Sequence, residues 1–310
     1  MTYILRTKQL TKTYREKEVV SNVSMNVQKG EIYGFLGPNG AGKTTVMKMM
    51  TNLVKPNRGE VEIFGEKWTN SSYEPLKRMG IVIENPIFFE KLTARENLEL
   101  HCEYMGFHNR NAINEALELV NLNQAESKPV REFSLGMKQR LGIARAITIK
   151  PELLILDEPI NGLDPIGIRE FRDLFKMLNK EFNITLLISS HILGEIEQLA
   201  DTIGVIREGL LLEETSMESI RGSHTEFIEV VTDDVNRAAF VLEHTMHITN
   251  FKVLDSKLVR IYDAEMSSRE LIQYFIANGI AIETISKKKQ TLDDYFYQLI
   301  HGEVTNVEFN

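Results

Sequence analysis

The residues of this chain that are best suited to chemistry form a glycine-rich run starting at position 37. Its members match the pattern G-x-x-x-x-G-K-[ST]: Gly37, Pro38, Asn39, Gly40, Ala41, Gly42, Lys43, Thr44 and Thr45. Glycines let backbone N–H groups turn toward phosphate oxygens, and a helix that begins at the loop adds partial positive charge. We expect Lys43 to reach the β and γ phosphates of a nucleotide and the Thr44 hydroxyl to ligate Mg²⁺.

Two adjacent carboxylates, Asp157 and Glu158, follow the apolar run Leu153–Leu156. Ligands of open α/β sheets bind at the carboxyl ends of the strands. We therefore expect Asp157 to hold Mg²⁺ through its water shell, and Glu158 to orient and polarise an attacking water. An ordinary solvated acidic pair is the alternative, and the phosphate loop earlier in the chain argues against it.

Strands and helices must position these residues. The run Ile32–Leu36 predicts a short buried strand before the loop, and apolar residues three and four apart predict a helix over Thr44–Leu53. The runs Leu153–Leu156 and Ile184–Ile188 predict two more buried strands, because continuous apolar strands need both faces covered. A parallel sheet flanked by helices follows from this alternation.

The remaining segments predict two further kinds of structure. Alternation in Ile4–Thr7 and Val23–Val27 indicates antiparallel strands, and helical periodicity prevails over residues 86–150. Beyond position 222 three strands, the last over Ile280–Ile285, alternate with helices near Val235–His244 and Ser268–Asn278. We expect a nucleotide-binding domain over residues 1–221 and a small α+β accessory domain over residues 222–310.

Composition narrows the functional class. The chain has 310 residues, 43% of them hydrophobic and 26% charged, which is enough to build a core and more than one ordinary domain needs. The net charge of −8 argues against nucleic acid as a partner. No run of about 18 apolar residues predicts a membrane span. A single cysteine, Cys102, cannot form an intramolecular disulfide, and this suits a reducing cytoplasm.

Three further motifs make the chain resemble the ATP-binding cassette ATPases. One lies between the phosphate loop and the acidic pair, and two follow the pair. The run Phe133–Arg140 looks like the signature sequence of that family, Asn161–Asp164 like its D-loop, and Ser189–His191 like its switch histidine. The resemblance covers about residues 1–215. It implies an α/β fold with a P-loop NTPase core, in which a mixed sheet is flanked by helices and joined by an antiparallel β subdomain and a helical subdomain at about residues 86–150.

The resemblance also implies roles for single residues. Two such domains form a head-to-tail clamp on ATP in this family, so Ser134 and the Gly136 backbone would donate to the γ-phosphate bound by a second copy. Asp164 belongs to the D-loop and would lie at the same nucleotide. His191 would steady the γ-phosphate and the water, and Tyr14 falls where the family places an aromatic ring that stacks on adenine.

Three positions depart from the family pattern. Leu135 stands where glycine is usual in the signature, and Ile160 stands where threonine is usual after the acidic pair. Glu84 stands where the family carries glutamine. An ionised carboxylate beside Mg²⁺ interacts by several kcal/mol at partly shielded range, so we expect Glu84 to act as a metal ligand and to increase the dependence on Mg²⁺. The alternative is that Glu84 only neighbours the real ligands.

Glu84, the signature residues and the C-terminal segment Thr291–Phe296 resemble one branch in particular. That branch is the ATPase subunit of bacterial exporters of the bacitracin-resistance and lantibiotic-immunity type. The resemblance implies an ATP- and Mg²⁺-dependent ATPase on the inner face of the cell membrane, which powers a separately encoded transmembrane permease for antimicrobial or other amphipathic peptides. It would touch the membrane only through that permease.

Two other classes of protein are alternatives. A cassette ATPase acting on ribosomes or DNA usually fuses two cassettes or carries coiled coils and basic tails, which this sequence lacks. A P-loop kinase or GTPase would lack the signature and the D-loop. The three consecutive apolar residues at 87–89 predict either a docking surface for the permease or a piece of the core.

Overall fold

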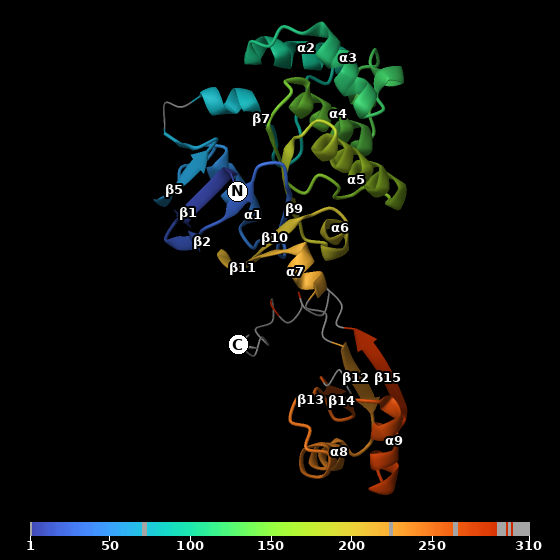
Figure 1. Ribbon diagram of the computed structural model, residues 1–310. Coiled ribbons are helices and arrows are strands. Elements are labelled where there is room, and N and C mark those ends of the chain that lie inside the picture. The colour runs from blue at the N-terminus through green and yellow to red at the C-terminus, as the bar shows by residue number, and fades with distance from the viewer. Residues whose placement is uncertain are drawn as a thin grey trace. The chain divides into compact units, whose positions relative to one another are not determined.

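The computed structural model describes residues 2–69, 73–222, 226–262, 266–289, 296 and 299. The chain divides into two compact units, Met1–Met217 and Glu218–Asn310, shown in Figure 1. Each unit has its own sheet and its own hydrophobic core. The predicted segment Thr291–Phe296 lies almost entirely outside the described residues.

A six-stranded mixed sheet forms the centre of the first unit, in the order β11-β10-β4-β9-β8-β7. Its strands are β4 (Ile32–Leu36), β7 (Met79–Val82), β8 (Leu153–Leu156), β9 (Thr185–Ser190), β10 (Thr202–Arg207) and β11 (Leu210–Ser216). All neighbours are parallel except β11, which pairs antiparallel with β10. Every residue of β4, β8 and β9 is buried, as their continuous apolar sequences predict. The predicted fold class is confirmed.

A five-stranded antiparallel sheet lies beside it, in the order β2-β1-β5-β6 with β3 paired to β1. Its strands are β1 (Tyr3–Tyr14), β2 (Lys17–Val23), β3 (Asn26–Gln28), β5 (Arg58–Ile63) and β6 (Glu66–Lys67). The predicted strand over Val23–Val27 is wrong in one respect, because β2 ends at Val23 and β3 begins at Asn26. The Thr7 hydroxyl accounts for this break: it donates to the Val23 carbonyl at 3.1 Å and accepts from the Met25 N–H at 2.9 Å.

Helices account for most of the rest of the first unit. They are α1 (Lys43–Met50), α2 (Ala94–Met105), α3 (Arg110–Leu119), α4 (Leu135–Thr148), α5 (Pro165–Lys180) and α6 (Leu193–Glu197), with 3₁₀ turns η1 (Glu74–Arg78), η2 (Asn123–Ala125) and η3 (Val130–Glu132). The boundary between the two units falls at the start of the short helix α7 (Met217–Gly222). The predicted helical character of residues 86–150 is confirmed by α2, α3 and α4. Helix α1 is shorter than predicted, because Asn52 has φ 58° and Leu53 is 63% exposed beyond the helix end. No helix within the described ranges is long and apolar enough to cross a membrane.

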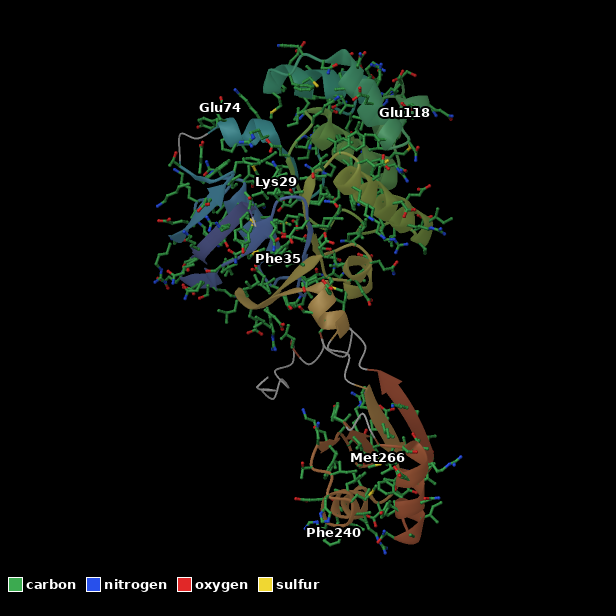
Figure 2. All side chains as sticks on the ribbon, viewed as in Figure 1. Lys29, Phe35, Glu74, Glu118, Phe240 and Met266 are labelled. Carbon is green, nitrogen blue, oxygen red and sulfur yellow. The ribbon has the colours of Figure 1, made fainter. Side chains whose placement is uncertain are left out.

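The second unit is a small α+β fold, as predicted. Its antiparallel sheet has the order β13-β14-β12-β15. The elements are β12 (Glu226–Val231), α8 (Val235–Phe240), a π-helical turn η4 (Val241–Thr245), β13 (Phe251–Val253), β14 (Leu258–Ile261), α9 (Ser268–Ala277) and β15 (Thr284–Lys289). Leu271 and Phe275 of α9 are fully buried in the core with residues of β12 and β14. In Figure 2 the side chain of Phe240 lies at α8, where it is 58% exposed.

The last strand of this unit starts later than predicted. Ile280 is buried, but its N–H donates to the Phe275 carbonyl at 2.9 Å, so it lies in the turn that follows α9. The predicted strand over Ile280–Ile285 is therefore wrong in its first residues, since β15 begins at Thr284. Sequence reasoning also missed β13, which has only three residues.

Helix α6 packs so closely on β4 that position 34 has no room for a side chain. A methyl group at Gly34 would lie 2.2 Å from Ile196 Cγ2 and 3.2 Å from Ala200 Cβ. We expect Gly34→Ala to lower the free energy of unfolding by about 1–3 kcal/mol, measured by urea denaturation. Gly194→Ala in α6 is the matched control, because among the described residues no heavy atom lies within 4 Å of the added methyl. The control should be neutral or stabilising by up to about 1 kcal/mol, and equal losses in both variants would contradict the packing.

Candidate functional site

The phosphate loop joins β4 to α1 at one end of the central sheet (Figure 1). Gly42 has φ 109°, a conformation open to glycine but strained for other residues, and α1 begins directly after it at Lys43. The Lys43 side chain is only 5% exposed. Its Nζ donates to the Gly37 carbonyl at 2.6 Å and lies 3.3 Å from the Pro38 carbonyl. The lysine is therefore held within its own loop, close to where the N–H groups of the first turn of α1 begin.

Asp157 and Thr44, the two residues expected to hold Mg²⁺, are brought together by the structure. The Thr44 hydroxyl donates to Asp157 Oδ2 at 2.7 Å, and Asp157 is 6% exposed. The Asp157 N–H donates to the Val82 carbonyl of β7 at 2.8 Å, which fixes the backbone behind the carboxylate. A hydroxyl and a carboxylate are hard oxygen donors of the kind Mg²⁺ prefers, so these residues fit that ion.

Glu158 lies between a cation and an imidazole. Its Oε1 is 3.1 Å from Lys43 Nζ, and its Oε2 is 2.8 Å from His191 Nδ1. The backbone of Glu158 has φ 48°, in the left-handed region that costs energy for a residue with a side chain. The structure thus brings together the three residues expected to be catalytic, and this carboxylate can hold and polarise a water beside bound phosphate.

Sequence reasoning missed the role of Ser189, although it noted the residue as part of a motif. The Ser189 hydroxyl donates to Asp157 Oδ1 at 2.6 Å and accepts the Glu158 N–H at 2.9 Å. The next residue, Ser190, donates to Glu195 Oε2 at 3.1 Å. Burial raises the pKa of the Glu195 carboxyl, and this hydrogen bond partly opposes the rise. Local sequence carries no signal for this role, because it depends on the parallel register of β8 and β9, which pairs Leu156 with Ile188 and so sets the residues after them side by side.

Glu84 is placed differently from the other predicted metal ligands. Its Oε1 is 2.6 Å from Lys48 Nζ, its side chain is 64% exposed, and its backbone has φ 59°. Lys48 lies one helical turn beyond Thr44 on α1. Glu84 is therefore near the phosphate-loop helix, but no hydrogen bond or ion pair between described residues joins it to Thr44 or Asp157.

The signature and D-loop residues cap two helices. Ser134 Oγ accepts the Met137 N–H at 3.3 Å at the start of α4, and Asp164 Oδ1 accepts the Gly167 N–H at 2.9 Å at the start of α5. Gln139, which sequence reasoning missed, links the two motifs by donating to the Asn161 carbonyl at 2.8 Å. Ser134 and Asp164 are exposed. Within the described part of one copy, no hydrogen bond or ion pair joins them to the phosphate loop.

The structure accommodates the leucine and the isoleucine that depart from the family pattern. Leu135 is 54% exposed, and a Cβ added at Gly162 of the D-loop would lie 3.4 Å from its Cδ2. A Cβ added at Gly136 would lie 3.3 Å from Cδ2 of Leu163, so the signature and the D-loop pack against each other. Ile160 is 3% exposed and belongs to the core. Leucine and isoleucine are thus accommodated without displacing Ser134 from its capping position.

Tyr14 offers an exposed ring at the end of β1. It is 44% exposed, and Lys12 Nζ lies 5.0 Å from the centre of the ring. The same ammonium donates to the Lys55 carbonyl at 2.7 Å, which holds it in place. An exposed aromatic face of this kind can stack on a planar base, and Lys12 adds a cation–π contact to the ring.

An exposed apolar surface follows β7. Ile87 is 86% exposed and Phe89 is 57% exposed, whereas Phe88 is half-buried beneath the Arg145 guanidinium, 5.0 Å from its ring centre. Arg145 also donates to the Ile87 carbonyl at 3.0 Å. The positive charge of Arg145 also acts on His101. Burial and, to a smaller extent, this charge lower the pKa of His101 to about 4, so this histidine is neutral near pH 7. The interpretation of residues 87–89 as part of the core is wrong for Ile87 and Phe89, and the docking surface stays a prediction.

Comparison with known proteins gives consistent results. A family model described as "ABC transporter" matches residues 20–161. The chain is 64% identical over 302 residues to an uncharacterized ABC transporter ATP-binding protein, YcbN, of Bacillus subtilis (strain 168), covering 97% of this chain and 98% of that protein. It is 47% identical over 302 residues to the bacitracin transport ATP-binding protein BcrA of Bacillus licheniformis, covering 97% and 99%.

Two further similarities each cover about two thirds of the chain. The chain is 44% identical over 209 residues to the lantibiotic transport ATP-binding protein SrtF of Streptococcus pyogenes, covering 67% of this chain and 89% of that protein. Among solved structures it resembles a dimeric post-hydrolysis state of the ATP-binding cassette MJ0796 bound to ADP and Pi. That match has a TM-score of 0.63 and 28% identity, and it covers 69% of this chain and 98% of the other.

The ion pair between Lys43 and Glu158 generates the second prediction. Glu158→Gln removes the carboxylate that can polarise a water, so we expect the rate of ATP hydrolysis to fall by about 10²–10⁴-fold. ATP affinity should be kept or increased, because Lys43 loses a competing anion; both are measured by a phosphate-release assay and by equilibrium binding. Glu195→Gln is the control, since that carboxylate bonds to Ser190, and its effect on the rate should stay below tenfold. Equal rates for both variants would contradict the assignment.

Proposed function

The chain belongs to the ABC transporter family as an ATP-binding subunit, and from this premise we propose that it hydrolyses Mg²⁺-bound ATP to drive peptide export by a separately encoded permease. The exported compounds would be antimicrobial or other amphipathic peptides. Near full-length similarity to a bacitracin transport protein supports the substrate class. ATP hydrolysis is supported by one observation above all: Glu158 contacts both Lys43 and His191 beside the phosphate loop.

The proposed ATP site uses the residues gathered at the sheet edge. The loop Gly37–Gly42 and the N–H groups of Lys43, Thr44 and Thr45 would bind the phosphates, and Tyr14 would stack on adenine. Thr44 and Asp157 would hold Mg²⁺, which when bound neutralises charge on the β and γ phosphates. Lys43 would turn from the Gly37 carbonyl to the phosphates, leaving Glu158 free to hold the attacking water.

We propose that a second copy completes this site. Ser134, the Gly136 backbone and Asp164 are exposed or half-exposed and contact their own helices within one copy. A partner's γ-phosphate would receive the Ser134 and Gly136 donors at the positive start of α4. Hydrolysis removes the γ-phosphate from this interface, and the differential affinity for the two nucleotides would open the clamp.

The partner permease would contact the surface made by Ile87 and Phe89. Large exposed apolar side chains next to one another are typical of interaction sites. We propose that this contact keeps the protein on the inner face of the membrane. Residues 1–221 would form the ATP-hydrolysing domain. Residues 222–310 would regulate that domain, help it to dimerise or stabilise it. No observation favours the alternative of a cassette that acts on ribosomes or DNA.

Permease binding through this surface is tested by Ile87→Asp. We expect the charge to reduce recovery of the permease with the tagged ATPase from detergent-solubilised membranes at least tenfold, because an unpaired carboxylate would be desolvated in the contact. Basal ATP hydrolysis should not change. Leu53→Asp is the control, since Leu53 is similarly exposed at 63% but lies beyond α1. Full recovery of the permease with Ile87→Asp would exclude this surface.

Glu84→Gln tests the proposed part of Glu84 in metal binding. The Mg²⁺ concentration that gives half-maximal hydrolysis should rise about threefold to tenfold, because a carboxylate attracts the ion more strongly than an amide. ATP binding without Mg²⁺ should tighten, since a repulsion from phosphate is lost. Lys48→Met, which removes the partner of Glu84, should move the Mg²⁺ curve the opposite way. Identical Mg²⁺ curves for wild type and Glu84→Gln would exclude the role.

A further inference from the structure

Ser189 hydrogen-bonds to both members of the acidic pair. Its hydroxyl donates to Asp157 Oδ1 at 2.6 Å and accepts the Glu158 N–H at 2.9 Å. The Thr44 hydroxyl donates to the other carboxylate oxygen of Asp157 at 2.7 Å. Asp157 is therefore clamped between two hydroxyls, one on the phosphate-loop helix and one on β9.

Both side chains are buried, so loss of these hydrogen bonds would be costly. Ser189 is fully buried and Asp157 is 6% exposed, so water does not replace a lost hydroxyl easily. A hydrogen bond to a charged carboxylate is stronger than one between neutral groups. With Oδ1 engaged by Ser189, the carboxylate plane is fixed and Oδ2 is directed to Thr44, where the proposed Mg²⁺ would lie.

The second bond acts on the backbone of Glu158. A residue with a side chain at φ 48° is strained, and such strain persists only where the surroundings hold it. Ser189 holds the N–H of Glu158, and the Glu158 carbonyl accepts the Asn161 N–H at 3.2 Å. This left-handed turn points the side chain of Glu158 to Lys43 and His191 instead of along the strand direction.

We propose that Ser189 is a positioning residue for the Mg²⁺-ATP site, where it aligns Asp157 toward the metal and fixes Glu158 in its left-handed conformation. The inference rests on the proposed ATPase function. It assigns Ser189 no contact with substrate and no proton transfer. Residues around a metal site that orient its direct ligands typically change metal affinity or activity by 10–100-fold when they are removed.

The test measures metal dependence by a readout other than turnover. Equilibrium binding of a non-hydrolysable ATP analogue to the full-length chain is followed while Mg²⁺ is titrated, for wild type, Ser189→Ala and Ser189→Thr. In Ser189→Ala we expect the half-saturating Mg²⁺ concentration to rise about tenfold, while analogue binding without Mg²⁺ stays within twofold of wild type. Ser189→Thr keeps the hydroxyl and should restore the wild-type Mg²⁺ curve at least in part.

The matched control is Thr185→Ala at the other end of β9. Thr185 is also fully buried, and its hydroxyl accepts the Gly30 N–H at 2.9 Å, far along the strand from the acidic pair. Its loss should lower the urea midpoint of unfolding but leave the half-saturating Mg²⁺ concentration within twofold of wild type. The control separates the loss of any buried hydroxyl in β9 from the loss of the one that holds Asp157.

Two results would overturn the inference in distinguishable ways. If the wild-type chain binds the analogue with a clear Mg²⁺ dependence and Ser189→Ala follows the same curve as Thr185→Ala, Ser189 has only a structural role and the proposed ATPase function stands. If the wild-type chain shows no Mg²⁺-dependent binding, the proposed function fails and the inference fails with it.

Discussion

Parallel pairing of β4, β9 and β8 is the constraint on which the site depends. The register aligns Leu36 with Ser190 and Leu156 with Ile188, so three strands end at one sheet edge. The phosphate loop leaves the first strand, the serines and His191 end the second, and the acidic pair follows the third. A Gly37 N–H donated to the Ser190 carbonyl at 3.3 Å ties the loop to its neighbour. A shift of one residue in either pairing would point each of these side chains to the opposite face.

The buried strands hold this alignment, and charged side chains lie at their ends. The Glu158 carboxylate contacts the Lys43 ammonium on one side and the His191 imidazole on the other, and all three side chains are partly shielded from water. The weak screening there strengthens each interaction relative to the surface. The exposed signature and D-loop residues have no hydrogen bond or ion pair to these three side chains within the described part of one copy, and in the proposed dimer they would act on the nucleotide of the second copy. Catalysis and dimer formation would thus be parts of a single equilibrium.

Sequence reasoning found the groups whose chemistry depends on local spacing. The loop from Gly37 to Thr45 and the acidic pair after a buried strand are set by neighbouring residues, and strand–loop–helix order follows from hydrophobic periodicity. Contacts between distant segments were not accessible in the same way. The bonds of Ser189 to Asp157 and Glu158 depend on the register of two strands, and the pair of Glu84 with Lys48 depends on a left-handed turn at Glu84. The helix end near Leu53 and the three-residue strand β13 were missed because local propensity is weak there.

In the proposed mechanism, two copies close on ATP through Lys43 of one and Ser134 of the other. Light scattering coupled to size-exclusion chromatography on the Glu158→Gln chain, with saturating ATP and Mg²⁺, measures this closure. We expect a mass twice that of the monomer with ATP, a return to the monomer with ADP, and no dimer when Ser134→Arg is added. A mass that stays monomeric while ATP is bound would contradict it.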